Sequence, residues 1–364
     1  MQISELAKAG CSVWLDDLSR AKLTGTDAHS LSPRIKNSGV VGVTTNPAIF
    51  KAAISDATEY AGDIATLKGK SVEEVITKLT TDDVREACDL FAEIHRSSKG
   101  ADGRVSIEVD PRSAHDTMAT VSEGKSLWQI IDRPNVLIKV PATLAGLPAI
   151  TELIGAGISV NVTLIFSVER YLQVIDAYIA GIEIAAKNGV DLTQIHSVAS
   201  FFISRLDTAI DPILKADGGA LANSLLGKAA IANAHLAYEQ FEKEFATSRW
   251  LTLATKGANA QRPLWASTGV KDPAYDDTRY VLELVAPNTV NTMPQGTLDA
   301  VIDHGVFKGN TIAGKYEDAR TVFSQLAELG ISIEKVTDDL ETDGVKKFAD
   351  AWNELLASVK GAMS

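Results

Sequence analysis

The chain has 364 residues, of which 45% are hydrophobic and 23% are charged, and its formal net charge is -12. This composition is typical of a soluble globular protein, and the acidic balance argues against nucleic acid or a membrane surface as a partner, because both attract basic patches. The first ten residues lack the apolar stretch of a signal peptide, and no apolar run reaches the ~18 residues of a membrane span. We therefore expect a cytoplasmic protein.

Eight short runs with β-strand character recur along the chain, and segments with helical periodicity lie between them. Strands that are apolar on both faces and alternate with helices predict a parallel sheet covered by helices. Eight is also the number that closes a (β/α)8 TIM barrel of the α/β class. An open doubly wound sheet is the alternative, but it needs a glycine-rich phosphate loop after its first strand, and the sequence offers none there. The runs are residues 12–17, 40–46, 105–110, 136–142, 158–165, 195–202, 263–268 and 289–294.

Helical periodicity is strongest in two segments between these runs. Residues 167–189 place apolar side chains at i, i+3 and i+4 spacing, and Gly189 stands where a helix would end. Residues 224–245 show a similar pattern. Both segments are long enough to cross the outside of a barrel from one strand to the next.

Two further segments exceed what a minimal barrel needs. We expect a helical insertion of two or three helices over about residues 51–104 and a helical tail over about residues 333–360. The apolar stripe of the tail predicts that it packs on the outside of the barrel, and a partner-binding helix is the alternative. Length alone allows two domains, but no linker interrupts the chain, so we predict a single catalytic barrel domain over residues 1–364.

Polar residues recur near the carboxyl ends of the predicted strands, where the active sites of TIM barrels lie. One buried polar residue would be a core residue satisfied by a hydrogen bond. Six or seven strands that each supply one are better explained as the lining of a site. These residues are Asp16 or Asp17, Asn46, Glu108, Lys139, Asn161, Thr163, Ser200 and Ser267.

Lys139 lies inside the apolar run VLIKV, and lysine is almost never fully buried unless it is paired. A buried neutral amine attacks carbonyl carbons to form a Schiff base, and burial raises the neutral fraction of an amine. Glu108 and Asp16 are the residue types that would move the protons of imine chemistry, and Thr163 would order a relaying water. The alternative is a structural ion pair between Lys139 and Glu108.

Motifs along nearly the whole chain together resemble those of the transaldolase family. The resemblance implies a class I aldolase-type barrel without metal or organic cofactor. Such an enzyme transfers a dihydroxyacetone unit from sedoheptulose 7-phosphate or fructose 6-phosphate to glyceraldehyde 3-phosphate or erythrose 4-phosphate, in the non-oxidative pentose phosphate pathway. The insertion and the tail are similar to those of the longer, single-function bacterial members. The motifs are WLDDLSR (14–20), GVTTNPAIF (42–50), VSIEVDPR (105–112), VLIKVPAT (136–143), GISVNVTLIFS (157–167), SVASFFISRLD (197–207), LWASTGVKDP (264–273) and NTMPQGTLDA (291–300).

The resemblance also implies catalytic roles for individual residues. Lys139 matches the Schiff-base lysine, and Glu108 matches an acid/base glutamate that works through a water held by Thr163. Asp16 matches the strand-one aspartate that handles the hydroxyl proton when the carbon–carbon bond breaks. Strand alternation alone does not choose between Asp16 and Asp17; only the resemblance selects Asp16.

Binding residues follow from the same motifs. The resemblance implies that Asn46, Asn161 and Ser200 hold the dihydroxyacetone moiety, and that Arg205 and Ser267 bind phosphate. A surface ion pair with a nearby aspartate is the alternative for Arg205. Lys271 would supply a second charge where shorter members place an arginine just after the serine, and a solvated loop lysine is its alternative.

Phe202 bears on the choice between transaldolase activity and fructose-6-phosphate aldolase activity. In the related fructose-6-phosphate aldolases, the strand-six position that resembles Phe202 is a tyrosine. The resemblance therefore implies that Phe202 favours transfer over simple cleavage. A fructose-6-phosphate aldolase-like enzyme and an inactive sugar-phosphate-binding barrel are the alternatives.

Features outside this candidate site are few. The six histidines do not have the spacing of metal ligands, so we expect no metal. His196 shares the strand face of Ser200 but lies deeper, which predicts a place in the core or at the bottom of the barrel. The expected partners are sugar phosphates, and the sequence leaves both a monomer and a homodimer open.

Overall fold

The computed structural model describes residues 2–55 and 58–363. Its parallel strands pair with their neighbours in chain order, and β8 pairs with β1 to close a barrel. The predicted (β/α)8 barrel is therefore confirmed, and the open sheet is excluded. Each of the eight predicted strands is present. The strands are β1 Cys11–Leu15, β2 Gly42–Val43, β3 Arg104–Glu108, β4 Val136–Pro141, β5 Val160–Ile165, β6 Ser197–Phe202, β7 Arg262–Ala266 and β8 Thr289–Met293.

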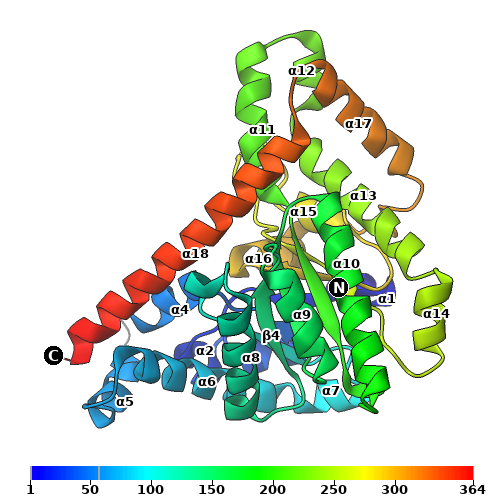
Figure 1. The fold of residues 1–364 in the computed structure, drawn as a ribbon. Coiled ribbons are helices and arrows are strands. Elements are labelled where there is room, and N and C mark those ends of the chain that lie inside the picture. The colour runs from blue at the N-terminus through cyan, green and yellow to red at the C-terminus, as the bar shows by residue number, and fades with distance from the viewer. Residues whose placement is uncertain (1, 56–57, 364) are drawn as a thin grey trace.

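Helices surround the barrel on its outside and extend beyond one of its ends (Figure 1). No helix in the described part of the chain is long and apolar enough to cross a membrane. The helices are α1 Gln2–Lys8, α2 Arg20–Thr24, α3 Leu31–Ser38, α4 Pro47–Ile54, α5 Ala61–Thr66, α6 Val72–Leu90, α7 Ala92–Ser97, α8 Thr117–Ile131, α9 Gly146–Gly155, α10 Val168–Lys187, α11 Ser204–Asp217, α12 Ala220–Leu225, α13 Ala229–Glu244, α14 Ser248–Ala254, α15 Arg279–Leu282, α16 Gln295–His304, α17 Tyr316–Glu328 and α18 Ile333–Met363, with short 3-10 turns η1 Thr58–Tyr60, η2 Pro111–Ser113 and η3 Leu192–Gln194.

The two predicted long helices have different outcomes. The helix predicted over residues 167–189 is α10, which follows an N-cap serine and ends before Gly189, whose φ of 74° suits glycine. The helix predicted over residues 224–245 corresponds to α13, which begins only at Ala229. Gly227 adopts a φ of 66° between α12 and α13, and this left-handed residue interrupts the helix. The predicted insertion holds the end of α4 and all of α5, α6 and α7.

Apolar side chains form two cores, one between the sheet and the outer helices and a smaller one inside the barrel. The inner core fills the middle of the barrel up to its mouth, so the barrel is packed and not an open pore. Its buried members are Trp14, Leu137, Leu164, Phe166, Val198, Phe202, Leu264, Ala266, Val290 and Phe348.

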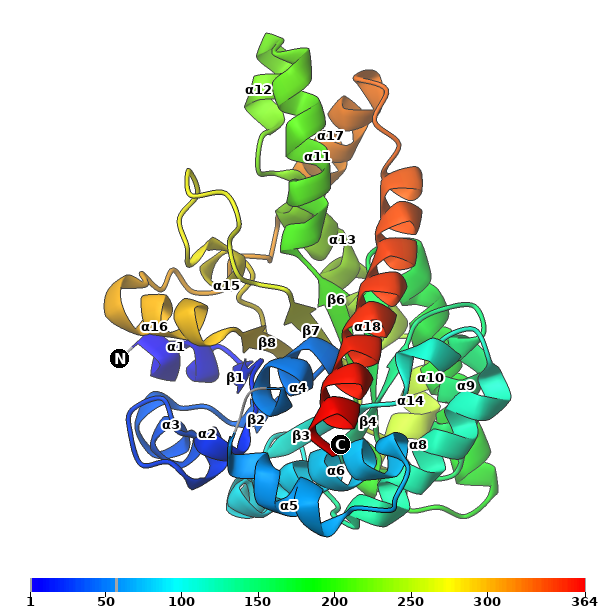
Figure 2. The ribbon, with the colours of Figure 1, turned by 90° about the vertical axis from the view of Figure 1, so that its left-hand side faces the viewer.

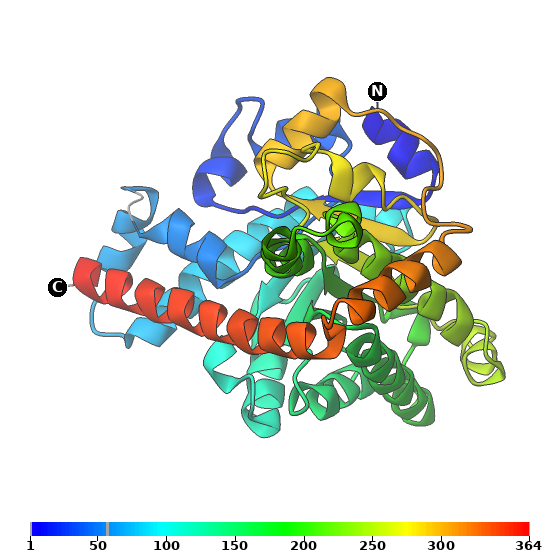
Figure 3. The ribbon, with the colours of Figure 1, turned by 90° about the horizontal axis from the view of Figure 1, so that it is seen from above.

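The helical tail corrects one expectation, because α18 crosses the mouth of the barrel and does not pack on its outside (Figures 2 and 3). The helix contacts α4, α6, α11 and β5. Phe348 of its apolar stripe enters the inner core, and Trp352 and Leu355 are buried as well. The apolar rings at the barrel mouth, such as Phe166, explain this placement. The stripe is therefore covered by the protein itself.

Candidate active site

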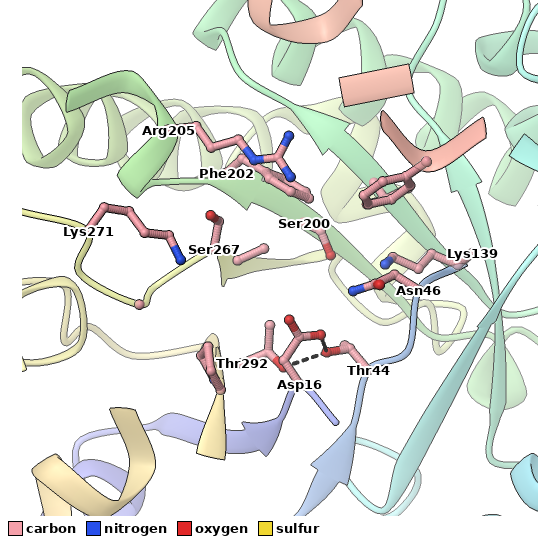
Figure 4. A pocket seen from close by; sticks show the side chains of 15 residues that line it. Asp16, Thr44, Asn46, Lys139, Ser200, Phe202, Arg205, Ser267, Lys271 and Thr292 are labelled. Carbon is pink, nitrogen blue, oxygen red and sulfur yellow. Dashed lines mark hydrogen bonds between the residues drawn. The ribbon is translucent and has the colours of Figure 1, made fainter. Parts of the chain in front are cut away.

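A pocket of about 140 Å³ opens at the carboxyl ends of the strands (Figure 4). Nine of the eleven site residues predicted from the sequence line it. The other two, Glu108 and Asn161, lie directly behind lining residues. The lining consists of Asp16, Thr44, Asn46, Lys139, Thr163, Ser200, Phe202, Arg205, Ala266, Ser267, Gly269, Lys271, Thr292, Pro294 and Phe348.

Lys139 comes from the middle of β4, and only 4% of the residue is exposed. Its Nζ donates a hydrogen bond to the carbonyl oxygen of Thr45 at 2.9 Å and lies 3.3 Å from Oε2 of Glu108. The pairing of β3 with β4 places Glu108 directly beside Lys139. The amine also lies over the ring of Phe348, with Nζ 5.6 Å from the ring centroid. The ion pair considered from the sequence exists, and its amine lines the pocket while its carboxylate does not.

Glu108 is buried without a hydrogen bond to either carboxylate oxygen among the described residues. Burial raises the pKa of Glu108 to about 7, although the charge of Lys139 opposes the shift. A carboxyl group with a pKa near neutrality exchanges protons efficiently in either direction at physiological pH. The side chain is therefore suited to general acid and general base chemistry beside the amine.

Asp16 follows β1 and lines the pocket, where its Oδ1 accepts a hydrogen bond from Oγ1 of Thr44 at 2.7 Å. Oγ1 of Thr44 in turn lies 2.6 Å from Oγ1 of Thr292. Burial raises the pKa of Asp16, and the charge of Lys139 and the hydrogen bond from Thr44 act against that shift. The neighbouring Asp17 forms an ion pair with Lys22 at 3.1 Å. The structure thus gives the two aspartates different partners and brings Asp16 to the amine.

Small polar groups complete the inner part of the pocket. Oγ1 of Thr163 is buried and has no hydrogen-bond partner among the described residues. Asn46 caps α4, since its Oδ1 accepts from the backbone N–H of Ile49 at 3.0 Å. The Oγ of Ser200 donates to Oδ1 of Asn161 at 2.7 Å. Thr163 is therefore free to bind a water or a hydroxyl group of a ligand.

Asn161 differs from the expectation that it lines the pocket. It is fully buried, and its Nδ2 donates to Oγ of Ser106 at 2.9 Å while its Oδ1 accepts from Ser200. With both ends of the amide occupied, Asn161 holds the hydroxyl of Ser200 in one orientation.

Arg205 lies in the first turn of α11, at the outer end of the pocket. Its Nη1 is buried without a hydrogen bond among the described residues, and its Cζ lies 5.3 Å from the ring centroid of Phe202. Burial lowers the pKa of Arg205. The nearby Asp207 and Asp211 accept hydrogen bonds from tyrosine hydroxyls, so the surface ion pair considered for Arg205 is absent among the described residues. The guanidinium is thus available to an anion.

Ser267 and Lys271 follow β7 and lie on the same side of the pocket as Arg205 (Figure 4). Ser267 has a φ of 55°, and its Oγ lies 3.0 Å from Oγ of Ser204. Lys271 is exposed and lines the pocket from the loop. Two cationic side chains and a hydroxyl therefore gather at this end, a combination that suits phosphate.

No group of three or more histidine, cysteine, aspartate or glutamate residues within the described ranges is placed to hold a metal ion. The reactive groups in the pocket are the amine of Lys139, the carboxyl group of Asp16 and several hydroxyls, and Glu108 lies beside the amine. A buried amine beside proton-exchanging carboxyl groups is the arrangement that imine chemistry requires.

Comparison with known proteins agrees with this chemistry. The family model described as transaldolase/fructose-6-phosphate aldolase matches residues 13–359. The chain belongs to this family. It is 58% identical over 363 residues to a transaldolase of Renibacterium salmoninarum, covering 99% of this chain and 96% of the relative. It is also 56% identical to transaldolase 2 of Streptomyces avermitilis and 55% identical to a transaldolase of Mycolicibacterium smegmatis, each over 99% of this chain and 97% of the relative.

Some lining residues of this transaldolase-family pocket are missing from the predicted set. Thr44 shares the strand face of Asn46, and Thr292 lies near the carboxyl end of β8, so the strand-end rule would have found both. Phe348 gave no such signal, because an amphipathic stripe indicates which face of a helix is buried but not what covers it.

Proposed function

We propose that this chain is a transaldolase that transfers a dihydroxyacetone unit through a Schiff base on Lys139. The donors would be sedoheptulose 7-phosphate or fructose 6-phosphate, and the acceptors glyceraldehyde 3-phosphate or erythrose 4-phosphate. One observation carries the proposal: a buried amine lies 3.3 Å from a carboxylate at one end of a pocket whose other end holds Arg205 and Lys271. Membership of the transaldolase family supports it.

The reaction begins when the neutral amine of Lys139 attacks the C2 carbonyl carbon of the ketose. The resulting carbinolamine loses water when a proton reaches its hydroxyl oxygen and the nitrogen lone pair forms the C=N bond. Glu108 gives this proton through a water bound to the free hydroxyl of Thr163, and its pKa of about 7 allows it to take the proton back later. The product is a protonated imine between Lys139 and the sugar.

Cleavage of the C3–C4 bond then requires a base at the C4 hydroxyl. Asp16 accepts the hydroxyl proton, the C4–O bond becomes a carbonyl, and the electron pair of the C3–C4 bond moves into the iminium. An aldose phosphate leaves, and an enamine of dihydroxyacetone stays on Lys139. Addition to the acceptor aldehyde reverses these steps, with Asp16 returning the proton. The hydrogen bond from Thr44 orients the carboxyl group for both directions.

The remaining lining residues would bind the two ends of the substrate. Asn46 and Ser200 hydrogen-bond the hydroxyl groups of the dihydroxyacetone portion, and Asn161 acts by orienting Ser200. The phosphate lies between Arg205 and Lys271, with Ser267 as a further donor. The unpartnered Nη1 of Arg205 supports this assignment, because a buried guanidinium N–H without an acceptor is costly.

Fructose-6-phosphate aldolase activity is the second candidate, since the family model covers both activities. Phe202 favours transfer. Its ring lines the pocket, packs 5.1 Å from the ring of Phe166 and carries no group that can deliver a proton to the enamine. We expect the enamine to stay attached to Lys139 until an acceptor aldehyde reacts with it. Release of free dihydroxyacetone without acceptor, at a rate matching transfer, would contradict this.

Borohydride trapping tests the central step. The protein is mixed with fructose 6-phosphate, reduced, digested and examined by mass spectrometry for an adduct on the peptide that contains Lys139. We expect a dihydroxyacetone-derived adduct, and no adduct and no turnover in Lys139→Ala. A full-length hexose phosphate adduct would mean that the imine forms without cleavage and would contradict the role of Asp16. No adduct on Lys139 in the native protein would refute the mechanism.

The third candidate, an inactive barrel that only binds sugar phosphates, is tested by the same samples. It predicts binding of fructose 6-phosphate, measured by calorimetry, without any adduct or turnover. The amine, Asp16 and the free hydroxyl of Thr163 share one pocket, and Glu108 lies 3.3 Å from the amine, which speaks against an inactive barrel.

A further inference from the structure

A second cavity, which we call the lower cavity, lies at the amino-terminal end of the barrel, opposite the active-site pocket. Its volume is about 180 Å³, and it shares no lining residue with that pocket. Space for a single water takes only about 10–15 Å³, so the lower cavity has room for a polyatomic ligand. Trp14 and Leu137 of the inner core line it on the side of the active site.

Arginine and histidine side chains from three strand beginnings line the lower cavity. Arg104 is the first residue of β3, Arg262 is the first residue of β7, and His196 directly precedes β6. The prediction that His196 lies at the barrel bottom is therefore confirmed. Convergence of the strands at this end of the barrel brings the two guanidinium groups to one cavity.

Arg104 is only 1% exposed, yet it forms no ion pair among the described residues. Its Nε donates to the carbonyl oxygen of Gly100 at 2.7 Å, and its Nη1 donates to the carbonyl oxygen of Pro134 at 3.1 Å and reaches Oγ of Ser159 at 3.5 Å. Its Nη2 makes no hydrogen bond within the described ranges. A buried charge without a counter-ion is costly, and burial lowers the pKa of Arg104 to about 9.

Gly100 lets the guanidinium of Arg104 and the imidazole of His196 pack closely against the backbone. A β-carbon at Gly100 would lie 3.0 Å from Nη2 of Arg104 and 2.7 Å from Nε2 of His196. The two nitrogens thus lie close together around a position that carries no side chain. The imidazole is neutral, since burial and the two arginines lower the pKa of His196 to about 3. Its Nε2 lies 3.4 Å from Nδ2 of Asn259, an amide donor, so this ring nitrogen accepts a hydrogen bond.

Among the described residues, Asp102 is the carboxylate that pairs with Arg262 at this site. Nη2 of Arg262 lies 3.0 Å from Oδ1 of Asp102, and Nη1 of Arg262 donates to Oγ of Ser12 at 2.9 Å. Asp102 also accepts hydrogen bonds from Ser12 and from Nε1 of Trp14. One carboxylate therefore faces two guanidinium groups, which leaves an excess of positive charge in an otherwise acidic protein.

We propose that the lower cavity binds a small tetrahedral oxyanion, either inorganic phosphate or the phosphate end of a phosphomonoester. The unpartnered Nη2 of Arg104 supplies donors for phosphate oxygens. Nη2 of Arg262 already bonds Asp102 and the carbonyl oxygen of Ala101, so Arg262 contributes its charge and the remaining hydrogen of Nη1. Asn288 at the edge of the cavity is exposed and Ala260 is partly exposed, so an ion reaches the cavity from solvent. An anion here would neutralise the excess charge that Asp102 leaves uncompensated.

Calorimetric titration with inorganic phosphate tests this site in a protein whose active-site phosphate position is weakened by Arg205→Gln. We expect one phosphate to bind per chain of that variant, and binding about tenfold weaker or more when Arg262→Gln is added, because charge-assisted hydrogen bonds are lost. Asp102 keeps its two other donors in this variant, which favours folding. Absence of binding to Arg205→Gln, or binding that Arg262→Gln leaves unchanged, would overturn the proposal.

A second variant removes no arginine. Ala260→Glu brings a carboxylate to the edge of the lower cavity, and we expect it to weaken phosphate binding as Arg262→Gln does. Phosphate binding of full strength in Ala260→Glu would count against the site even if Arg262→Gln did not fold. Both single variants should keep wild-type turnover, which separates this proposal from the proposed function.

Titration with glycerol 3-phosphate distinguishes the two sources of the anion. Equal binding of glycerol 3-phosphate and inorganic phosphate, both sensitive to Arg262→Gln, would indicate a phosphomonoester site. Binding of inorganic phosphate alone would indicate a site for the free ion.

Discussion

The ionisation of Glu108 is coupled both to the stability of the fold and to the proposed chemistry, so the substitution Glu108→Gln tests the mechanism from two sides. The amide has nearly the shape of the carboxyl group but does not titrate. Glu108 is 7% exposed and lies beside the buried amine of Lys139. Any change in how stability or turnover depends on pH is therefore attributable to one proton.

The expected effect on stability follows from the shifted pKa. Burial raises the pKa of Glu108 from an ordinary value of 4.5 to about 7, so the folded state binds this proton more tightly than the unfolded state. The stabilisation from this proton is fully present below pH 4.5 and is lost as the pH rises to about 7. This shift in the pKa of Glu108 corresponds to a change of about 3 kcal/mol in the free energy of unfolding. Relative to wild type, Glu108→Gln should therefore be more stable by about 3 kcal/mol at pH 8 than at pH 4.

The expected effect on turnover has a different size and a different signature. A glutamine cannot exchange the proton that carbinolamine dehydration needs, so the rate of imine formation should fall by about 10²–10⁴. The dissociation constant for fructose 6-phosphate should change little, because Glu108 does not line the pocket. Urea unfolding at several pH values and pre-steady-state imine formation measure the two effects.

Glu123 provides a matched control elsewhere in the fold. Burial raises the pKa of Glu123 to about 7 as well, and its Oε2 accepts a hydrogen bond from the backbone N–H of Asp110 at 2.9 Å. Glu123→Gln should reproduce the pH-dependent stabilisation and leave turnover intact. If Glu108→Gln slowed imine formation no more than this control does, Glu108 would not be the acid/base. A stability difference that is the same at every pH would refute the shifted pKa.

Three further substitutions test the other parts of the site. Arg205→Ala should raise the KM for fructose 6-phosphate by about tenfold to a hundredfold, and Lys271→Ala should raise it less because its charge is exposed; steady-state kinetics with unphosphorylated fructose should show neither effect. Asn46→Ala should lower the free energy of unfolding by about 1 kcal/mol, because the backbone N–H of Ile49 loses its capping acceptor. Asn46→Ser should restore the thermal midpoint but not turnover. Phe348→Ala should lower the free energy of unfolding by about 3–5 kcal/mol; a urea-unfolding loss below about 1 kcal/mol would show that α18 is not anchored at the barrel mouth.

Strand periodicity made the barrel and most of the pocket predictable. Because side chains alternate along a strand, Lys139 had to face the same way as Leu137, and both do point into the barrel. The same rule places Glu108 and Asn161 on the inner face, and the register of β3, β4 and β5 brings them to Lys139. Strand alternation does not tell how deep in the barrel a side chain lies. For that reason Asn161 was expected to line the pocket, whereas it is buried and accepts a hydrogen bond from Ser200.

Alternation fails where a strand ends. Ser267 has the strand parity of Trp265, whose indole points into the outer core and donates to the carbonyl oxygen of Leu284. The left-handed φ of 55° at Ser267 breaks that parity and turns its hydroxyl into the pocket. Serine rarely adopts this conformation, so the strand-end position of Ser267 predicted a site residue correctly although its strand parity points away from the pocket.

The helical tail shows how a local pattern leaves a tertiary contact undetermined. Gly344 lies against the barrel mouth, where a β-carbon would come within 3.2 Å of Leu164 and 3.4 Å of Phe166. The missing side chain lets α18 approach the strands closely, and Phe348, one turn later on the same face, reaches the amine of Lys139. A larger residue at 344 would lift the helix and with it the ring that shields the amine from water. The pocket is therefore complete only after the last helix has folded across the barrel.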